Sequence, residues 1–327
     1  MSPSSWAAPR SRPGASSAAP EATRAFMGAN YIDVGPWAAR YGLKLTWVEK
    51  GKRVRLESAF TEIHLEGDRR ELLLNDLRVF LGEPIVASGG TLWIGVTDAR
   101  DLLGAILRPA AISVRAPELK LICLDAGHGG NDTGTQNKAL KLDEKRLTLD
   151  VAQRVKRLLE GQGYKVLMTR TDDRFIELEE RAAISNRAGA DLFISIHFNS
   201  FSQPAIKGTE TYILTRKTQR STGGTKREPS DNVGLPGNAM DPWNGLLGYA
   251  MHRQLTGKLK TFDRGLKFAR FKVLTLVKCP GVLIESGYLS NEAEARKIMT
   301  PAYRNEIAAG IVNGITSYAT QLAASQK

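Results

Sequence analysis

The feature that most constrains this chain is the alternation of apolar runs with helix-like segments that begins at Leu119. The runs fit buried strands, and between them apolar residues recur at helical spacing. We therefore expect an α/β fold: a three-layer domain whose central, mostly parallel or mixed sheet is flanked by helices. The predicted strands are 119–124, 165–168, 192–196, 209–214 and 282–284, and the predicted helices are 142–159, 178–188 and 243–259.

Two signals predict helix starts near the end of the chain. Asn291, followed by Glu294 three residues later, has the pattern of a capping box. Thr300 stands before Pro301, and proline is well tolerated at the first helical position. A helix is therefore expected after each of these signals.

The part of the chain before Leu119 is organised differently. Residues 1–27, rich in Ser, Pro and Ala, predict a disordered leader. Residues 28–109 predict a small β-rich α+β domain, in which 47–56 looks like a hairpin. Residues 110–118 are predicted to be a linker, and residues 119–322 are predicted to form the main domain. The small domain also contains a weak repeat of 62 residues, in which Ile32, Val34, Ala38 and Gly42 correspond to Ile94, Val96, Arg100 and Gly104.

Composition limits the partners of the chain. A net charge of +12 predicts an acidic partner, either nucleic acid or an anionic cell envelope. The basic cluster at 216–227 has no interleaved aromatic residues and no recognisable nucleic-acid-binding module surrounds it, so nucleic acid is not expected. No apolar run reaches the roughly 18 residues of a membrane helix, so no integral membrane segment is expected.

The two cysteines, Cys123 and Cys279, lie in or beside apolar segments and lack the spacing of metal ligands. We expect both to be buried, and whether they pair stays open. His64 alternates with Ile63 and Leu65 and is interpreted as an ordinary strand residue.

Three polar residues follow predicted strands and carry the functional prediction. His128 lies in a glycine-rich turn after the first strand of the main domain, His197 follows a second strand, and Glu285 follows a third. Ligands of open α/β sheets bind at the carboxyl ends of the strands, so these side chains are expected to converge. Two histidines and a glutamate around an open position form a catalytic zinc set, and a separate carboxylate would move the proton of a metal-activated water.

Each of these residues also has a structural interpretation. A histidine after a strand is often simply hydrogen-bonded. Glu144 is favoured near a helix N-terminus by the helix dipole alone, and adjacent Asp143 could act in its place. The turn around His128 could cradle an anion, although it lacks the Lys-Ser/Thr of a phosphate loop. No H-E-x-x-H zinc motif is present.

A series of motifs across about 119–322 resembles the zinc-dependent N-acetylmuramoyl-L-alanine amidases, as their type 3 catalytic domain. The resemblance consists of Asp125-Ala126-Gly127-His128-Gly129-Gly130-Asn131-Asp132-x-Gly134, Glu144-Lys145, Thr169-Arg170, Leu178 with Arg181 and Asn186, Ser195-Ile196-His197-x-Asn199, Gly208-x-Glu210, Arg264-Gly265-Leu266, and Glu285-Ser286-Gly287-Tyr288-Leu289-Ser290-Asn291. This resemblance implies hydrolysis, in peptidoglycan, of the amide between N-acetylmuramic acid and the L-alanine of the stem peptide.

The resemblance also implies roles for individual residues. His128, Glu144 and His197 would bind Zn²⁺, Glu285 would be the catalytic carboxylate, and Asn199 would orient the substrate. Arg170 and Arg181 are expected to be structural, pairing with helix carboxylates. The chain departs from the family pattern at Ser286 and Tyr288, where the family usually has leucine and phenylalanine.

Residues 28–109 loosely resemble the small domain at the N-terminus of copper amine oxidases and of many bacterial wall enzymes, which implies a wall-binding or spacer module. The polar segment 215–241 is expected to border the cleft as a flap or cover, because a loop that long is usually functional or disordered. Location in the cell envelope, periplasmic or extracytoplasmic, follows from the resemblance. Residues 1–22 lack the apolar run of a signal peptide, so the export route stays open.

Two rival functions remain from the sequence. One is a catalytically silent wall-binding protein with the amidase fold, and the other is a zinc peptidase that cuts within the stem peptide. All four residues of the predicted centre are present, which argues against the silent protein. Whether a protein activator is required stays open.

Overall fold

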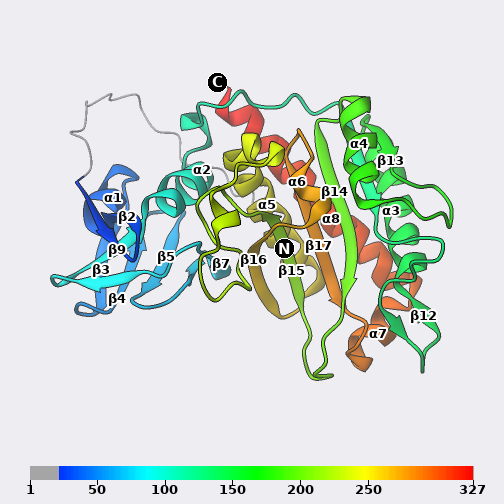
Figure 1. Cartoon of the computed structure of the whole chain (residues 1–327), viewed down its shortest axis with the longest axis horizontal. Helices are drawn as coiled ribbons and strands as arrows, with labels where there is room; N and C mark the ends of the chain where they lie inside the picture. The colour runs from blue at the N-terminus through cyan, green and yellow to red at the C-terminus, as the bar shows by residue number, and fades with distance from the viewer. Residues whose placement is uncertain (1–21, 327) are drawn as a thin grey trace.

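The computed structural model describes residues 22–326 and is built around one mixed sheet of 11 strands (Figure 1). Four neighbouring strands are parallel, and β15 runs antiparallel to them beside β17. Helices cover both faces, so the predicted three-layer fold is confirmed. In spatial order the strands are β13 (Lys165–Met168), β10 (Leu121–Ala126), β14 (Leu192–Asn199), β17 (Gly281–Tyr288), β15 (Thr209–Leu214), β16 (Asp263–Ala269), β7 (Leu77–Phe80), β6 (Glu71–Leu74), β5 (Glu62–Glu66), β4 (Arg53–Glu57) and β3 (Lys44–Glu49).

The two faces of the sheet form two hydrophobic layers, because successive side chains of a strand point in opposite directions. Residues such as Ile122 and Ile194 pack in the larger core with α3 (Glu144–Glu160), α5 (Asp241–Leu259) and α8 (Pro301–Ser325). Cys123 and Phe193 face the smaller core with α4 (Leu178–Ala188) and α6 (Lys272–Thr275). Both cysteines are buried and free. No helix among residues 22–326 has the length and apolarity needed to cross a membrane.

The predicted strands and helices of the main domain are found, but β16, the short helix α6 and the two-residue strands β11 (Gln136–Asn137) and β12 (Leu142–Asp143) were not predicted, and one predicted capping box is only partly formed. Strand β16 was missed because it is rich in polar residues and contains Gly265, which has φ 101°. At α7 (Glu292–Ile298), Asn291 accepts from the Glu294 amide as predicted. The Glu294 carboxylate instead accepts from the amides of Gly208 and Tyr288, so the capping box is only half formed. Thr300 caps α8 as expected.

The N-terminal part contains a second sheet, in the order β1 (Thr23–Phe26), β2 (Ala29–Asp33), β9 (Thr91–Gly95) and β8 (Val86–Ser88). The two predicted repeats meet there, since Ile32 pairs with Ile94 across β2 and β9. Each repeat continues into a helix, α1 (Val34–Arg40) in the first and η1 (Asp98–Gly104) with α2 (Ala105–Leu107) in the second. The predicted hairpin is β3–β4. Most of the predicted leader lies outside the described residues, but its end forms β1.

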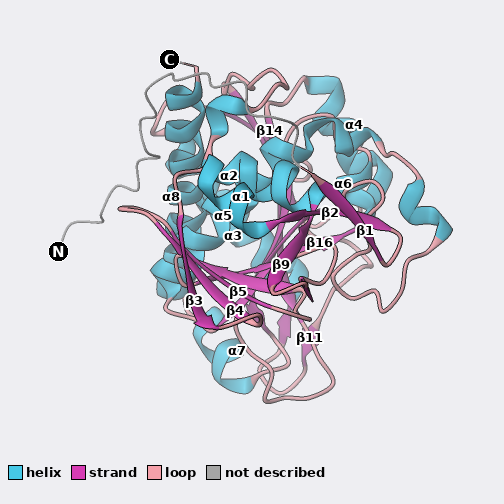
Figure 2. Ribbon diagram, turned by 90° about the vertical axis from the view of Figure 1, so that its left-hand side faces the viewer, coloured by secondary structure: helices cyan, strands magenta, loops and turns pink. Residues whose placement is uncertain are grey.

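Strands β3 to β7 continue the main sheet of the molecule. Leu266 of β16 pairs with Val79 of β7, and the Asp263 carboxylate accepts a 2.7 Å hydrogen bond from the Arg78 amide. On the helical side, α2 packs against α5, as Figure 2 shows from the N-terminal side. The region before residue 110 is thus joined to the rest through both a sheet and a helix contact.

Segment 215–241 does not lie where the flap hypothesis placed it. It follows β15, which runs antiparallel to β14 and β17, so the segment starts at the sheet edge opposite their carboxyl ends. It contains η3 (Pro229–Asn232) and η4 (Pro236–Met240) and packs on the N-terminal part. Gln219 donates to Asp98 at 2.8 Å, and Arg227 pairs with Glu83 at 2.8 Å. Strand direction therefore contradicts a cover over the cleft.

Candidate metal centre

The turn after β10 presents His128 at the carboxyl edge of the sheet. His128 has φ 62°, a left-handed conformation that a residue other than glycine adopts only when its surroundings hold it. Two buried arginines provide this support. Arg181 donates to the carbonyls of Ala126 and His128, and Arg170 donates to those of Ala126 and Gly127. The arginines are structural, as predicted, but they mainly bind backbone carbonyls and not helix carboxylates.

Asp125, the last polar residue of β10, anchors this arrangement from inside the protein. Its carboxylate is fully buried and accepts hydrogen bonds from Arg181 at 2.8 Å and from the hydroxyls of Thr169 and Ser195 at 2.7 Å. Burial acts to raise the pKa of Asp125, but Arg181 and the two hydroxyls outweigh it and lower the pKa. A charged aspartate therefore ties β10 to the neighbouring strand ends.

The structure distinguishes Glu144 from Asp143, which their shared position at a helix start could not; the family motif had favoured Glu144. Asp143 turns toward Gln136 and Arg146. Glu144 is buried and accepts hydrogen bonds from the amides of Thr135 and Phe198. Burial alone would raise its pKa, but His128 and His197 lower it, so the carboxylate stays charged.

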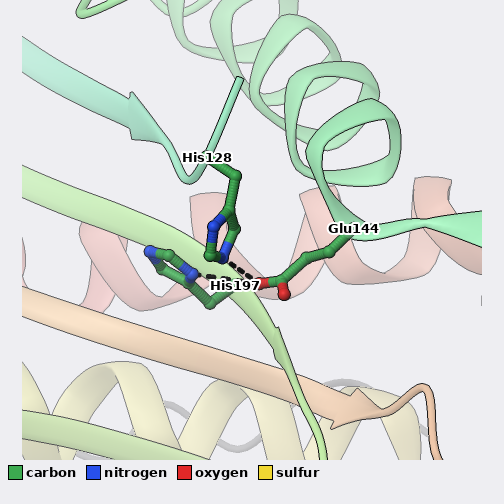
Figure 3. Close-up of side chains that lie close together, drawn as sticks. All are labelled: His128, Glu144 and His197. Atoms are coloured by element: carbon green, nitrogen blue, oxygen red, sulfur yellow. Dashed lines mark hydrogen bonds and ion pairs between the residues drawn. The ribbon is translucent and has the colours of Figure 1, made fainter. Parts of the chain in front are cut away.

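His128, Glu144 and His197 converge on one point, with their candidate ligand atoms all within 4.8 Å of one another (Figure 3). Glu144 Oε1 lies 3.1 Å from His128 Nε2 and 3.0 Å from His197 Nδ1. Of the described residues, these three form the one group that could hold a metal ion. His64 instead pairs with Glu62, and buried His252 bridges Thr211 and Asp263.

Two glycines make room for these side chains. A Cβ on Gly127 would lie 2.2 Å from the His197 ring. A Cβ on Gly134, whose φ is 63°, would lie 2.6 Å from His128 and 2.7 Å from the Glu144 carboxylate. Gly127 and Gly134 are therefore steric requirements of the site.

Asp132 belongs to the site, although no role was predicted for it. Its Oδ2 lies 2.8 Å from His128 Nδ1, while Nε2 of the same ring faces Glu144. A carboxylate on the far nitrogen fixes the tautomer and orientation of a metal-binding histidine. The sequence signal that could have identified Asp132 was its position four residues after His128 in the first motif.

Glu285 lies beside the cluster on the next strand. It pairs with His197 in the β14–β17 register, so their side chains point to the same face of the sheet. Its Oε2 is buried and has no hydrogen-bond partner among residues 22–326. Burial and the charges of Glu144 and Glu210 raise the pKa of Glu285 well above its ordinary value. Such a carboxyl group is suited to holding and releasing a proton.

A second carboxylate, that of Glu210, lies next to Glu285 across the sheet, so that His197, Glu285 and Glu210 form one row of side chains on neighbouring strands. Glu210 pairs with Glu285 in the β15–β17 register and is itself buried. It accepts from Arg264 and Lys267, both at 2.8 Å, and from the Tyr288 hydroxyl at 2.6 Å. Burial opposes its charge, but Lys267 and the tyrosine hydroxyls lower the pKa of Glu210 to about 2.

The remaining residues of interest lie around this row. Tyr288, one of the two departures from the family pattern, binds Glu210, whereas Ser286 points to the opposite face of β17 from Glu285. The Asn199 amide lies 3.3 Å from Glu210 Oε2, so Asn199 is beside the row and outside the metal cluster. Glu210 and Lys267 were not predicted as site residues because the residues they contact lie on other strands, far away in the sequence.

Fold and site together define a class: an α/β enzyme domain with a candidate metal centre at the carboxyl edge of its sheet. The chain belongs to the N-acetylmuramoyl-L-alanine amidase family, whose model matches residues 122–317. This match covers more than half of the chain and includes every residue of the candidate centre. Family membership supports peptidoglycan hydrolysis as its function.

Individual relatives agree with this assignment. The chain is 36% identical to the uncharacterised protein YqiI of Bacillus subtilis, over 67% of this chain and 94% of YqiI. It is 32% identical to the N-acetylmuramoyl-L-alanine amidase AmiC of Escherichia coli, over 61% of this chain but only 52% of AmiC. The solved CwlD amidase of Clostridioides difficile, in complex with the GerS lipoprotein, is 29% identical with a TM-score of 0.51, covering 61% of this chain and 98% of CwlD. The match thus spans about half the length of AmiC.

Proposed function

We propose that this protein is a zinc-dependent N-acetylmuramoyl-L-alanine amidase of the bacterial cell envelope. The observation that carries the proposal is the convergence of His128, Glu144 and His197 with Glu285 in register beside His197. The sequence match to the amidase family supports the identity of the cleaved bond, the amide between N-acetylmuramic acid and L-alanine. Location outside the cytoplasm follows from a peptidoglycan substrate.

The donor set of the cluster fits zinc. Two imidazole nitrogens and one carboxylate are the ligands of a catalytic zinc site that keeps a fourth position open. Gly127 and Gly134 leave space where a larger side chain would fill the centre, and Asp132 orients His128 from behind. A zinc ion held there would polarise the amide carbonyl and increase the acidity of a water molecule.

Glu285 is proposed to move the proton. Its position one strand from His197 lets it take a proton from the attacking water and deliver the proton to the nitrogen of the leaving L-alanine. The unpaired Oε2 is free for this task, since no described residue occupies it. Asn199, at the end of β14, is proposed to orient the substrate from the adjacent strand end.

The test is digestion of purified sacculi by the full chain, with and without a chelator, followed by mass analysis of the products. Amidase activity releases peptides that begin with L-alanine and leaves free lactyl groups on the glycan. Cleavage between stem-peptide residues would instead establish the peptidase, and sacculi that stay intact with zinc and with every candidate activator added would establish the silent binding protein. Cleavage that persists in the chelator would refute the zinc mechanism.

Residues 28–109 are proposed to form a module that contacts the wall, as the loose likeness to the copper amine oxidase N-terminal domain implies. Its sheet connection to β16 favours a module fixed to residues 119–322 over a freely hinged spacer. The complex of the relative CwlD with a lipoprotein motivates a search for a protein activator. Adding candidate envelope proteins to the sacculus assay and measuring the initial rate tests that idea.

A further inference from the structure

We infer that Arg264 and Lys267 form a subsite for a free carboxylate on the peptide side of the scissile amide, so that they determine which stem peptides are cleaved. This inference rests on the proposed amidase function. It concerns a polar cluster that the proton-transfer chemistry itself does not use.

The order of side chains across the sheet gives the direction in which the substrate lies. His197 on β14, Glu285 on β17 and Glu210 on β15 occupy one row on one face. Because Glu285 delivers a proton to the leaving nitrogen, that nitrogen lies close to Glu285. The peptide attached to it then extends away from the metal cluster, over β15 and β16.

The cluster that the peptide would meet there is positively charged. Arg264 and Lys267 both bind Glu210, so two cations share one carboxylate and one positive charge remains. Both side chains keep some exposure, 25% for Arg264 and 13% for Lys267. Among the described salt bridges, no other carboxylate pairs with either cation.

The cations also keep hydrogen-bond donors for a ligand. Arg264 binds Glu210 through Nε alone, although a guanidinium has five N–H groups in a planar fork that suits a carboxylate. Lys267 has three donors, and its described hydrogen bond to Glu210 uses one. The Tyr288 ring, 5.5 Å from the guanidinium, and the Tyr212 ring, 5.8 Å from the ammonium, hold the cations in place.

The reach from the leaving nitrogen agrees with the peptide chemistry. In a stem peptide whose second residue is a γ-linked glutamate, the α-carboxylate of that residue is free. It lies at most about 7 Å from the leaving nitrogen, counting one Cα–Cα step and the flanking bonds. Neighbouring strands are about 5 Å apart, so β15 and β16 lie about 5 and 10 Å from β17. The side chain of Arg264 or Lys267 is long enough to span the distance that remains between β16 and that carboxylate.

The experiment uses two muramoyl tripeptides that differ only at this group: N-acetylmuramoyl-L-alanyl-γ-D-glutamyl-L-lysine and the same compound with the α-carboxylate converted to its amide. The zinc-loaded full chain is expected to hydrolyse the carboxylate compound with a kcat/KM higher by about ten- to a hundredfold, the range for a charge-assisted hydrogen bond. In Arg264→Gln the ratio of the two kcat/KM values should fall toward one, because the loss falls mainly on the carboxylate compound. Arg296→Gln, which deletes an exposed charge paired with Glu292, is the matched control and should keep the preference.

Equal kcat/KM values for the two compounds in the wild-type protein would overturn the subsite while leaving the amidase function intact. A parallel loss on both compounds in Arg264→Gln would also overturn it, because a residue that only positions Glu210 would act on both. If the wild-type protein cleaves neither compound nor sacculi, the proposed function fails and the subsite fails with it.

Discussion

Asp132 holds the ring nitrogen of His128 that faces away from Glu144, with Oδ2 at 2.8 Å from Nδ1. The histidine thus lies between two carboxylates, one on each nitrogen. Burial opposes its protonation, but Glu144 and Asp132 together raise the pKa of His128. A ring held on one side by Asp132 is oriented for a ligand on the other side before any ligand arrives.

Replacing this orienting carboxylate should weaken metal binding without unfolding the protein. Asp132→Asn is expected to lower zinc affinity by about ten- to a hundredfold, the usual effect of losing such a partner. Competition with a chromogenic chelator measures the affinity. Asp172→Asn, which removes an exposed carboxylate paired with Arg174, is the control. Unchanged zinc affinity in Asp132→Asn would contradict the orienting role.

Glu285 should be separable from the metal ligands. Glu285→Gln is expected to keep zinc, since Glu285 is outside the His–Glu–His cluster, and to lose about a hundred- to ten-thousandfold in rate. Metal content by mass spectrometry and release of L-alanyl peptides give the two readouts. Loss of zinc together with activity would place Glu285 among the ligands instead.

The space left by Gly134 should be needed for the metal centre. Gly134→Ala puts a methyl group 2.6 Å from His128 and 2.7 Å from Glu144, so zinc affinity should fall sharply. Gly189→Ala is a matched control, because Gly189 has φ 65° but nothing within 4 Å of its added Cβ. Both variants should lose about 1 kcal/mol of stability from the left-handed backbone. If both bind zinc equally well, steric room at Gly134 is not the reason for glycine.

The buried pair of Asp125 and Arg181 should govern stability in acid. Because the folded-state pKa of Asp125 is lowered, its contribution is complete above its unfolded value of about 3.9 and is lost as pH falls through the lower folded value. Asp125→Asn should cost about 3–5 kcal/mol near neutral pH, since it leaves Arg181 buried without its charge partner.

Urea unfolding of wild type and Asp125→Asn at pH 7 and pH 3 checks this expectation. The difference in unfolding free energy between the two proteins should shrink at the lower pH. Asp172→Asn, which removes one partner of an exposed ion pair, should lower the free energy of unfolding by at most about 1 kcal/mol at either pH. If the difference in unfolding free energy between wild type and Asp125→Asn is the same at both pH values, the ionisation of Asp125 does not contribute to acid stability as expected.

The amino-acid sequence by itself determined the α/β class, most strand and helix positions, and the two histidines of the candidate metal cluster. It could do so because buried strands are apolar and the polar residues that follow them stand out, as His128, His197 and Glu285 do. The family motifs then singled out Glu144, where helix-dipole arguments allowed Asp143 equally.

Only the tertiary structure decided what depends on strand order and direction. The antiparallel course of β15 takes segment 215–241 away from the cleft, and the row from His197 through Glu285 to Glu210 exists because β14, β17 and β15 are neighbours. Residues brought together by such pairing are far apart in the chain, so no local pattern signals them. The choice of Glu144 over Asp143 was likewise decided by which side chain reaches the histidines.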